Sequence, residues 1–349
     1  MDFEDCIISE ENGKYFYNRY VHKSQKDVCL LLERQYGFRA NIFPSGMNAI
    51  ATAFQVLFME NRWQNVNVVF GNELYCDTPR TIKYLSESYI KLNMFKIKVQ
   101  DDANVMDVFN NQIDKSLPTI LFIESCSNPN GYIFNFDLLA GLKDNVKNLR
   151  VIVDNTWLTS VIFNPFRFDG VDIVVMSLTK YYGADRSGIM GAVVCRNDEI
   201  ADRVFNYGRI IGSHVCPLYC KEMVRAIETM GERVRRTSEM TLEVARYLKG
   251  KNIPVSYPKL EDHISYERAR KYFLEFGPSV LTLSVRMRKE EALKWMRSSK
   301  FVCSTSFGAS DTRFDQWPMY SKKHSTCRLS IGFDDNLENI LEELDRLLV

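Results

Sequence analysis

The chain has 349 residues, enough for one large and one smaller domain. Lys and Arg total 45 and Asp and Glu total 44, so the net charge of +1 provides no overall field that would favour nucleic acid or an anionic membrane. Nine scattered cysteines form neither a disulfide framework nor a zinc-ligand pattern, and no apolar run approaches the roughly 20 residues of a membrane-spanning helix. With an acidic N-terminus that carries no secretory signal, we expect a cytoplasmic protein with reduced thiols, no metal site, and no nucleic-acid or membrane partner.

The N-terminal half predicts an arm, a helix and then a sheet. Leucines recur at helical spacing from Asp27 to Tyr36, behind an aromatic arm. Beyond this helix, strand-like apolar runs alternate with amphipathic stretches. The runs are Val66 to Phe70, Phe95 to Val99, Thr119 to Glu124, Val151 to Asp154, and Val171 to Met176. Such alternation predicts an α/β fold with a mostly parallel central sheet and helices on both faces.

The C-terminal half predicts a bridge and a second, smaller α/β domain. Residues 217–251 carry apolar side chains at helical spacing and should form the bridge. The later segments with clear periodicity are two strands, Ser279 to Arg286 and Cys327 to Ile331, and two helices, Glu290 to Ser298 and Asn336 to Val349. We expect three units: an arm with the first helix at 1–40, a large domain at 41–230, and a small domain with the bridging helix at 231–349.

Lys180 is the first candidate for chemistry, because it follows a buried-type strand that ends in Ser177-Leu178-Thr179. A buried amine is costly unless it is paired or chemically used, and partial desolvation lowers its pKa as Schiff-base formation requires. The strand pattern alone favours a lysine that reaches solvent. The neighbouring candidates reverse that preference.

Asp154 and two hydroxyl-bearing segments are expected at the same edge of the sheet, where ligands of open α/β sheets bind. A carboxylate at residue 154 can keep a pyridinium nitrogen protonated, as pyridoxal phosphate (PLP) needs, although alone it would more often cap a helix. The turn Ser45-Gly46-Met47 precedes an apolar helix over 49–58 and exposes N–H groups suited to a phosphate, although Ser-Gly there is usually only a cap. Ser177 and Thr179 could add hydroxyl donors to the same phosphate.

Seven motifs occur in order from about Tyr17 to the C-terminus. They are Tyr17-Asn18-Arg19; Ser45-Gly46-Met47; Tyr75 with Thr78 and Arg80; Glu124-Ser125 with Ser127-Asn128-Pro129; Val153-Asp154-Asn155-Thr156; Ser177-Leu178-Thr179-Lys180; and Arg328-Leu329-Ser330-Ile331-Gly332. Together they resemble the Cys/Met-metabolism family of fold-type I PLP-dependent transferases and lyases. This is the group of cystathionine γ-synthase, cystathionine γ-lyase, cystathionine β-lyase and methionine γ-lyase.

The resemblance implies roles around the ring of PLP. Lys180 would hold the cofactor as a Schiff base and then act in turn as acid and base. Asp154 would pair with the pyridine nitrogen, and Asn128 would hydrogen-bond the 3-oxygen of the ring. Tyr75 would stack on the ring and could take part in proton transfer; its alternative role is that of a core aromatic.

The resemblance also implies a phosphate site shared between subunits. The residues expected from one subunit are Ser45, Gly46, Met47, Ser177 and Thr179. Tyr17 and Arg19 would reach the same phosphate from a neighbour, which makes a homodimer with shared active sites obligatory. Relatives also form tetramers through a longer arm, and with sixteen residues before Tyr17 both assemblies stay open.

Three residues are implied in substrate binding. Arg328 would clamp the α-carboxylate of an amino-acid substrate with its bidentate fork, unless it forms only an exposed structural salt bridge. Ser306 lies where the family adds a further carboxylate contact. Asp311 falls near the family position beside the distal end of the substrate, where it could read an amine or merely face solvent.

The implied activity is γ-elimination or γ-replacement on a C4-activated homoserine derivative or on cystathionine. Two alternatives remain: β-elimination from cystathionine or cysteine, and a PLP-fold protein that binds partners without catalysis. The chain departs from the family at His22-Lys23-Ser24, Cys76-Asp77 and Ala184-Asp185-Arg186-Ser187. These departures leave the cofactor residues intact and indicate an altered substrate.

Overall fold

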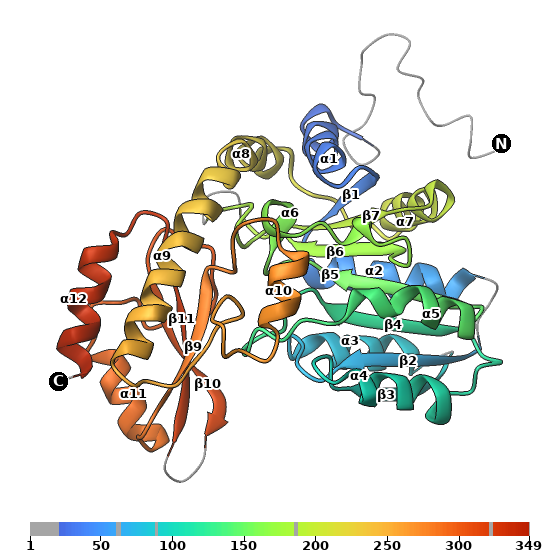
Figure 1. Ribbon diagram of the computed structural model, residues 1–349. Coiled ribbons are helices and arrows are strands. Elements are labelled where there is room, and N and C mark those ends of the chain that lie inside the picture. Colours follow the sequence, from blue (N-terminus) through green and yellow to red (C-terminus); the bar gives the residue numbers. More distant parts are fainter. Residues whose placement is uncertain (1–20, 61–63, 88–89, 185–187, 321–323, 349) are drawn as a thin grey trace.

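A computed structural model describes residues 21–60, 64–87, 90–184, 188–320 and 324–348 of the chain. A large sheet and a small sheet lie side by side, each with its own helices, and the helix α10 (Tyr266–Tyr272) lies between them (Figure 1). Among these residues, no helix has both the length and the apolar composition needed to cross a membrane.

The large sheet has seven strands in the order β1-β7-β6-β5-β4-β2-β3. The strands are β1 (Arg39–Phe43), β2 (Asn65–Gly71), β3 (Lys91–Ile97), β4 (Thr119–Glu124), β5 (Leu149–Asp154), β6 (Ile173–Ser177) and β7 (Gly191–Cys195). The neighbours from β3 through β2, β4 and β5 to β6 pair in parallel, whereas β7 is antiparallel to both β6 and β1. The carboxyl ends of β4, β5 and β6 therefore meet at one edge.

Helices cover both faces of this sheet because alternate residues of its buried strands point in opposite directions. Val151 and Val153 belong to one apolar core and Ile152 to the other. The first core is closed by α1 (Lys23–Tyr36), α4 (Asp102–Asp107), α5 (Leu139–Asn145), α6 (Thr159–Ile162) and α8 (Pro217–Glu228). The second is closed by α2 (Gly46–Met59), α3 (Asp77–Ser86) and α7 (Asp198–Ile210). Short π- or 3₁₀-helical turns occupy Val108–Gln112, Phe136–Leu138 and Pro165–Arg167.

The small sheet is antiparallel throughout, in the order β10-β11-β9-β8. Its strands are β8 (Val255–Ser256), β9 (Val280–Val285), β10 (Arg313–Tyr320) and β11 (Ser325–Ser330). The helices α9 (Met230–Gly250), α11 (Lys289–Arg297) and α12 (Leu337–Leu348) contribute to its apolar core and lie on the same side of the molecule (Figure 1). This part of the chain thus has a core of its own.

The structure confirms the predicted α/β arrangement and corrects several elements. The strands β1, β7, β8 and β10 were not predicted; β1 and β7 have five residues each and β8 has two, too few to show a clear period. The strand expected over 95–99 lies at Lys91–Ile97. The helix expected over 49–58 begins at Gly46, because the Ser45 side chain caps it by accepting from Asn48 N. The helical segment 217–251 is divided into α8 and α9 at Thr229.

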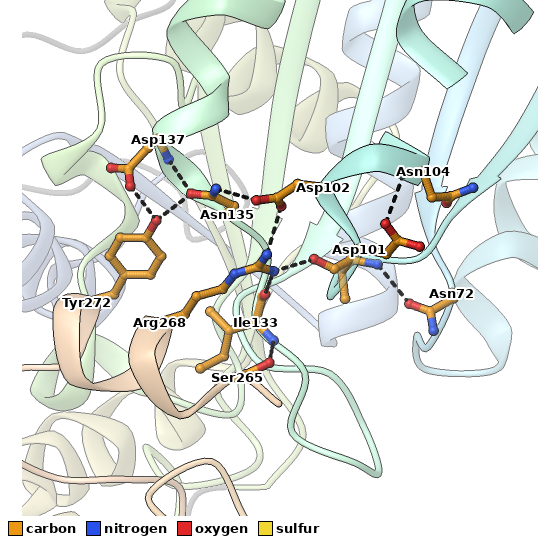
Figure 2. Close-up of polar contacts among 11 residues, drawn as sticks. Asn72, Asp101, Asp102, Asn104, Ile133, Asn135, Asp137, Ser265, Arg268 and Tyr272 are labelled. Atoms are coloured by element: carbon orange, nitrogen blue, oxygen red, sulfur yellow. Dashed lines mark hydrogen bonds and ion pairs between the residues drawn. The ribbon is translucent and has the colours of Figure 1, made fainter. Parts of the chain in front are cut away.

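Arg268 ties α10 to the loops at the edge of the large sheet. Its guanidinium donates hydrogen bonds to Val99 O at 2.8 Å, to Ile133 O at 2.7 Å and to Asp102 Oδ1 at 2.7 Å (Figure 2). Asn135 Nδ2 donates to the other oxygen of Asp102 at 2.8 Å. The loops that follow β3 and β4 are therefore held by one side chain from the helix between the sheets.

We expect Arg268→Ala to lower the free energy of unfolding by about 2–4 kcal/mol, because two carbonyls and a carboxylate lose a shared charged donor. Chemical denaturation followed by circular dichroism measures the change. Arg270→Ala is the matched control on the same helix, since Arg270 forms an exposed pair with Glu267 and should change stability by less than about 0.5 kcal/mol. Equal effects of the two substitutions would contradict a connecting role for Arg268.

Candidate active site

Lys180 follows β6 and meets a loop from the small sheet. Its Nζ donates a hydrogen bond to Ser306 Oγ at 2.7 Å and lies 5.2 Å from the ring centroid of Phe307. Gly308 packs against the main chain of Lys180, where a Cβ would come within 2.9 Å of the Lys180 carbonyl carbon. Ser306 has φ 100°, an uncommon conformation for a residue with a side chain. The half-buried Lys180 is thus held by its amine against a loop from the small-sheet part of the chain.

Asp154 ends β5 as a buried carboxylate. Its Oδ1 accepts hydrogen bonds from Thr156 N at 2.9 Å and from Thr156 Oγ1 at 2.5 Å. Burial raises the pKa of Asp154 to about 6, and the two hydrogen bonds from Thr156 oppose that shift. The next helix begins at Thr159 with Leu158 at its N-cap, so a helix-capping role for Asp154 is wrong.

Thr156 joins the ends of β5 and β6. Its hydroxyl donates to Asp154 and accepts from Ser177 N at 2.8 Å. Lys180 comes three residues after Ser177. The Thr156 hydroxyl therefore fixes the end of β5, which carries Asp154, relative to the end of β6, which leads to Lys180.

The N-terminus of α2 lies directly on β6 and β7. A Cβ at Gly46 would come within 2.8 Å of Ser177 Cβ, and a Cβ at Gly191 would come within 2.3 Å of Ser45 O. The first intrahelical bond runs from Ala49 N to Ser45 O at 3.0 Å, so the N–H groups of Gly46 and Met47 precede it and have no acceptor within the helix. Ser45, Gly46, Met47 and Ser177 are brought together, and the N–H groups make this place suitable for an anion.

Thr179 is placed differently. Its hydroxyl donates to Met190 O at 3.2 Å and accepts from Met190 N at 3.1 Å. These two bonds fasten the turn after β6 to the residue before β7. A contact of this hydroxyl with a phosphate stays a prediction.

Arg328 of β11 is buried, with 3% of its side chain exposed. Its Nη1 donates to Asn128 Oδ1 at 3.1 Å, and its Nη2 donates to Thr305 Oγ1 and to Asp315 Oδ2, both at 3.2 Å. Its Cζ lies 5.8 Å from the centroid of the same Phe307 ring that lies near Lys180. Burial lowers the pKa of Arg328 and the Asp315 carboxylate opposes this, so the alternative of an exposed salt bridge is wrong.

Tyr75 lies in the loop between β2 and α3, where 45% of it is exposed. The alternative role of a core aromatic is therefore wrong. Its backbone N–H donates to Glu124 Oε1 at 2.6 Å, which ties the loop to the end of β4. Partial burial raises the pKa of the phenol, and the neighbouring Asp77 raises it further.

The remaining predicted residues lie elsewhere or outside the described residues. Asp311 is exposed and accepts a hydrogen bond from Ser310 Oγ at 2.9 Å, so it faces solvent in this structure. Tyr17 and Arg19 lie outside the described residues. Within those residues, no group of three or more His, Cys, Asp or Glu side chains could hold a metal ion.

Two acidic residues of the site were missed from the sequence. Asp315 is the cross-strand partner of Arg328 in the β10–β11 register, a pairing that could be found only once β10 was known. Glu73 accepts from Ser127 Oγ at 2.7 Å and from Asn130 Nδ2 at 2.5 Å, so it holds the loop that carries Asn128. Its place in a loop left no periodic signal.

Comparison with known proteins extends over nearly the whole chain. The family described as Cys/Met metabolism PLP-dependent enzyme matches residues 2–346. Cystathionine beta-lyase of Schizosaccharomyces pombe is 29% identical over 313 residues, which cover 88% of this chain and 75% of the relative. L-methionine gamma-lyase of Fusobacterium nucleatum subsp. nucleatum is 30% identical over 362 residues, which cover 96% of this chain and 86% of the relative.

Solved structures share the fold. Cystathionine gamma synthase from Xanthomonas oryzae pv. oryzae, solved in complex with cystathionine, matches with a TM-score of 0.85 at 21% identity and covers 96% of this chain and 87% of its own. Cystathionine gamma-lyase from yeast matches with a TM-score of 0.84, also at 21% identity, over 97% of this chain and 88% of its own. These matches confirm the predicted fold.

Proposed function

Because the chain belongs to the Cys/Met metabolism family of PLP-dependent enzymes, we propose that it catalyses γ-elimination or γ-replacement on a C4-activated homoserine derivative or on cystathionine. The observation that carries the proposal is the position of the Lys180 amine and the buried Arg328 guanidinium around one aromatic ring, Phe307. A base and a carboxylate clamp next to the same ring suit an α-amino acid whose Cα lies between them.

The residues of the site fit PLP. Gly46 lets the N-terminus of α2 pack directly against Ser177, since a Cβ there would come within 2.8 Å of Ser177 Cβ, and the N–H groups at this helix N-terminus can hold a phosphate. Oδ2 of Asp154 accepts no hydrogen bond from the described residues, so it is available to the ring nitrogen. In this proposal Lys180 binds the aldehyde carbon, Asn128 donates to the 3-oxygen and Tyr75 covers the ring.

When bound, PLP supplies an electron sink for the negative charge that develops at the substrate Cα. Once the substrate's amino group has replaced it on the aldehyde carbon, Lys180 Nζ would be free to take the proton from Cα. For γ-chemistry it would pass that proton to C4′ of the cofactor before it takes one from Cβ. Arg328, with Ser306 beside it, orients the α-carboxylate so that the Cα proton faces this amine. Phe307 and the neighbouring apolar residues limit the access of water to the reacting atoms.

β-Elimination is the second candidate, and it is favoured by the 29% identity to a protein named cystathionine beta-lyase. β-Elimination needs the Cα proton to be removed but not a Cβ proton, so the same Lys180 and Arg328 would serve. The two reactions differ in their products and can be separated directly.

Incubation with cystathionine and with O-acyl and O-phospho homoserines, followed by mass spectrometry, tests the reaction. We expect γ-elimination to release 2-oxobutanoate, or γ-replacement to join the four-carbon unit to an added thiol. Pyruvate with homocysteine from cystathionine would contradict γ-chemistry and support the second candidate. Lys180→Ala is the control, and it should lose at least about a thousandfold of the rate together with the visible absorption band of the cofactor.

Arg328→Ala should raise KM for the amino-acid substrate by about a hundredfold, because a bidentate charged contact with the carboxylate is lost, while PLP affinity changes little. Arg328→Lys keeps the charge without the planar fork and should give an intermediate KM. Steady-state kinetics and a PLP titration measure the two quantities. An unchanged KM would remove Arg328 from the substrate site.

We also propose a homodimer that shares its active sites. Large apolar side chains are exposed in the segment after Lys180 and around the α7–α8 connection; they are Ile189, Ile210, Ile211, Leu218 and Tyr219. A Cβ at Gly188 would lie 3.5 Å from the Tyr219 ring, so the loop after Lys180 lies against α8. Exposed apolar surface of this kind suits a subunit interface next to the site.

Arg19→Ala should weaken PLP binding about tenfold to a hundredfold in the dimer, because Arg19 is proposed to reach the phosphate of the partner subunit. Lys14→Ala is the control, since it removes an equal charge from the same arm. Equilibrium dialysis measures PLP retention and analytical ultracentrifugation measures the assembly. A fully active monomer would refute the shared site.

A further inference from the structure

Two carboxylates end adjacent strands of the large sheet. Glu124 ends β4 and Asp154 ends β5, and the two are Cα partners in the parallel register. Adjacent strands lie about 4.8 Å apart, and paired residues project to the same face of the sheet. Glu124 is 8% exposed and Asp154 is 9% exposed. The edge that carries the proposed ring-nitrogen partner therefore holds a second buried acid, to which the proposed reaction gives no role.

The two acids differ in their charged neighbours. Thr156 donates two hydrogen bonds to Asp154, and Glu124 accepts from the backbone N–H groups of Tyr75 and Asn128, so hydrogen bonds favour the ionised form of both. Glu124, however, lies near two other carboxylates, Asp154 and Glu73. Burial raises the pKa of Glu124 well above its usual range, and the negative charges of Asp154 and Glu73 raise it further. Two buried carboxylates on paired strand ends do not both ionise at little cost, so the proton of the pair belongs on Glu124, which faces the second acid Glu73 as well.

We propose that Glu124 is a positioning residue whose uncharged carboxyl group holds the main chain at Tyr75 and leaves Asp154 as the one ionised acid of the pair. The inference rests on the proposed function in one respect, which is that Tyr75 and Asp154 contact PLP. A neutral carboxyl group keeps a carbonyl oxygen that can accept from Tyr75 N, so it loses no hydrogen bond by being protonated. A second negative charge would instead compete with Asp154 for the ring nitrogen.

Glu124→Gln is the first test, because glutamine has the shape of the protonated acid and keeps the acceptor oxygen. The probe is pyridoxamine 5′-phosphate, which binds without forming a bond to Lys180. We expect its Kd and the pH profile of kcat/KM to stay within about twofold of wild type. A Kd raised more than about tenfold, or a displaced pH profile, would show that the enzyme needs an ionised Glu124 and would overturn the proposal.

Glu124→Met is the matched variant, because it keeps the chain length and removes the oxygen that accepts from Tyr75. Loss of this hydrogen bond should raise the Kd for pyridoxamine 5′-phosphate about fivefold to tenfold, with no change for Glu124→Gln. Equal affinities of the Met variant and the wild type would refute the positioning role. The comparison with glutamine separates this role from packing, which both variants keep.

Infrared spectroscopy tests the protonation state without cofactor or activity. The wild-type protein at neutral pH should show the carbonyl stretch of a buried carboxylic acid, and Glu124→Gln should lose it. Absence of that band from the wild type would overturn the proposal even if the Met variant failed to fold. If wild type binds no pyridoxamine 5′-phosphate, the proposed function fails, whereas the infrared result still decides the state of Glu124.

Discussion

Burial of ionisable groups around the carboxyl edge of the large sheet is the constraint on which the rest of the site depends. Asp154, Glu124 and Arg328 are each less than one tenth exposed, and a buried ionisable group without a hydrogen-bond partner costs several kcal/mol or loses its charge. Each of the three has specific hydrogen-bond partners in the surrounding structure. Thr156 donates twice to Asp154, Tyr75 N donates to Glu124, and Asp315 pairs with Arg328.

The contacts of the site bring together parts of the chain that lie far apart in sequence. Gly308 allows the loop before β10 to approach the Lys180 backbone, and Asn128 reaches Arg328 across 200 residues. Arg268 then holds the loops after β3 and β4 from outside the site (Figure 2). The C-terminal part of the chain therefore contributes to the candidate site, with Ser306 and Phe307 from the loop before β10 and Arg328 from β11.

The sequence predicted the parts of this arrangement that follow from local pattern. Residues such as Asp154 and Lys180 end or follow long apolar strands, and such strands are recognised by composition alone. Short strands without a clear period, such as β1 and β7, were missed. Because β10 was missed as well, Asp315, the cross-strand partner of Arg328, could not be found. Asp154 does not cap a helix because its Oδ1 accepts a hydrogen bond from the backbone N–H of Thr156, two residues later, in a tight turn. The partners of these side chains depend on strand register and loop conformation, which hydrophobic periodicity in one sequence does not determine.

The cofactor residues do not by themselves decide between the β- and γ-reactions. The strand ends are fixed by register, and proteins named as β-lyase, γ-lyase and γ-synthase share the family with this chain. The β- and γ-reactions both begin with removal of the Cα proton, so Lys180 and Asp154 do not distinguish them. They diverge when the leaving group and Cβ are handled, at the distal end of the substrate. Two exposed features lie outside the cofactor residues: the Asp77–Arg80 pair in the first turn of α3, which follows Tyr75, and the solvent-facing Asp311. Exposed loops and helix ends of this kind commonly set substrate choice among proteins of one fold.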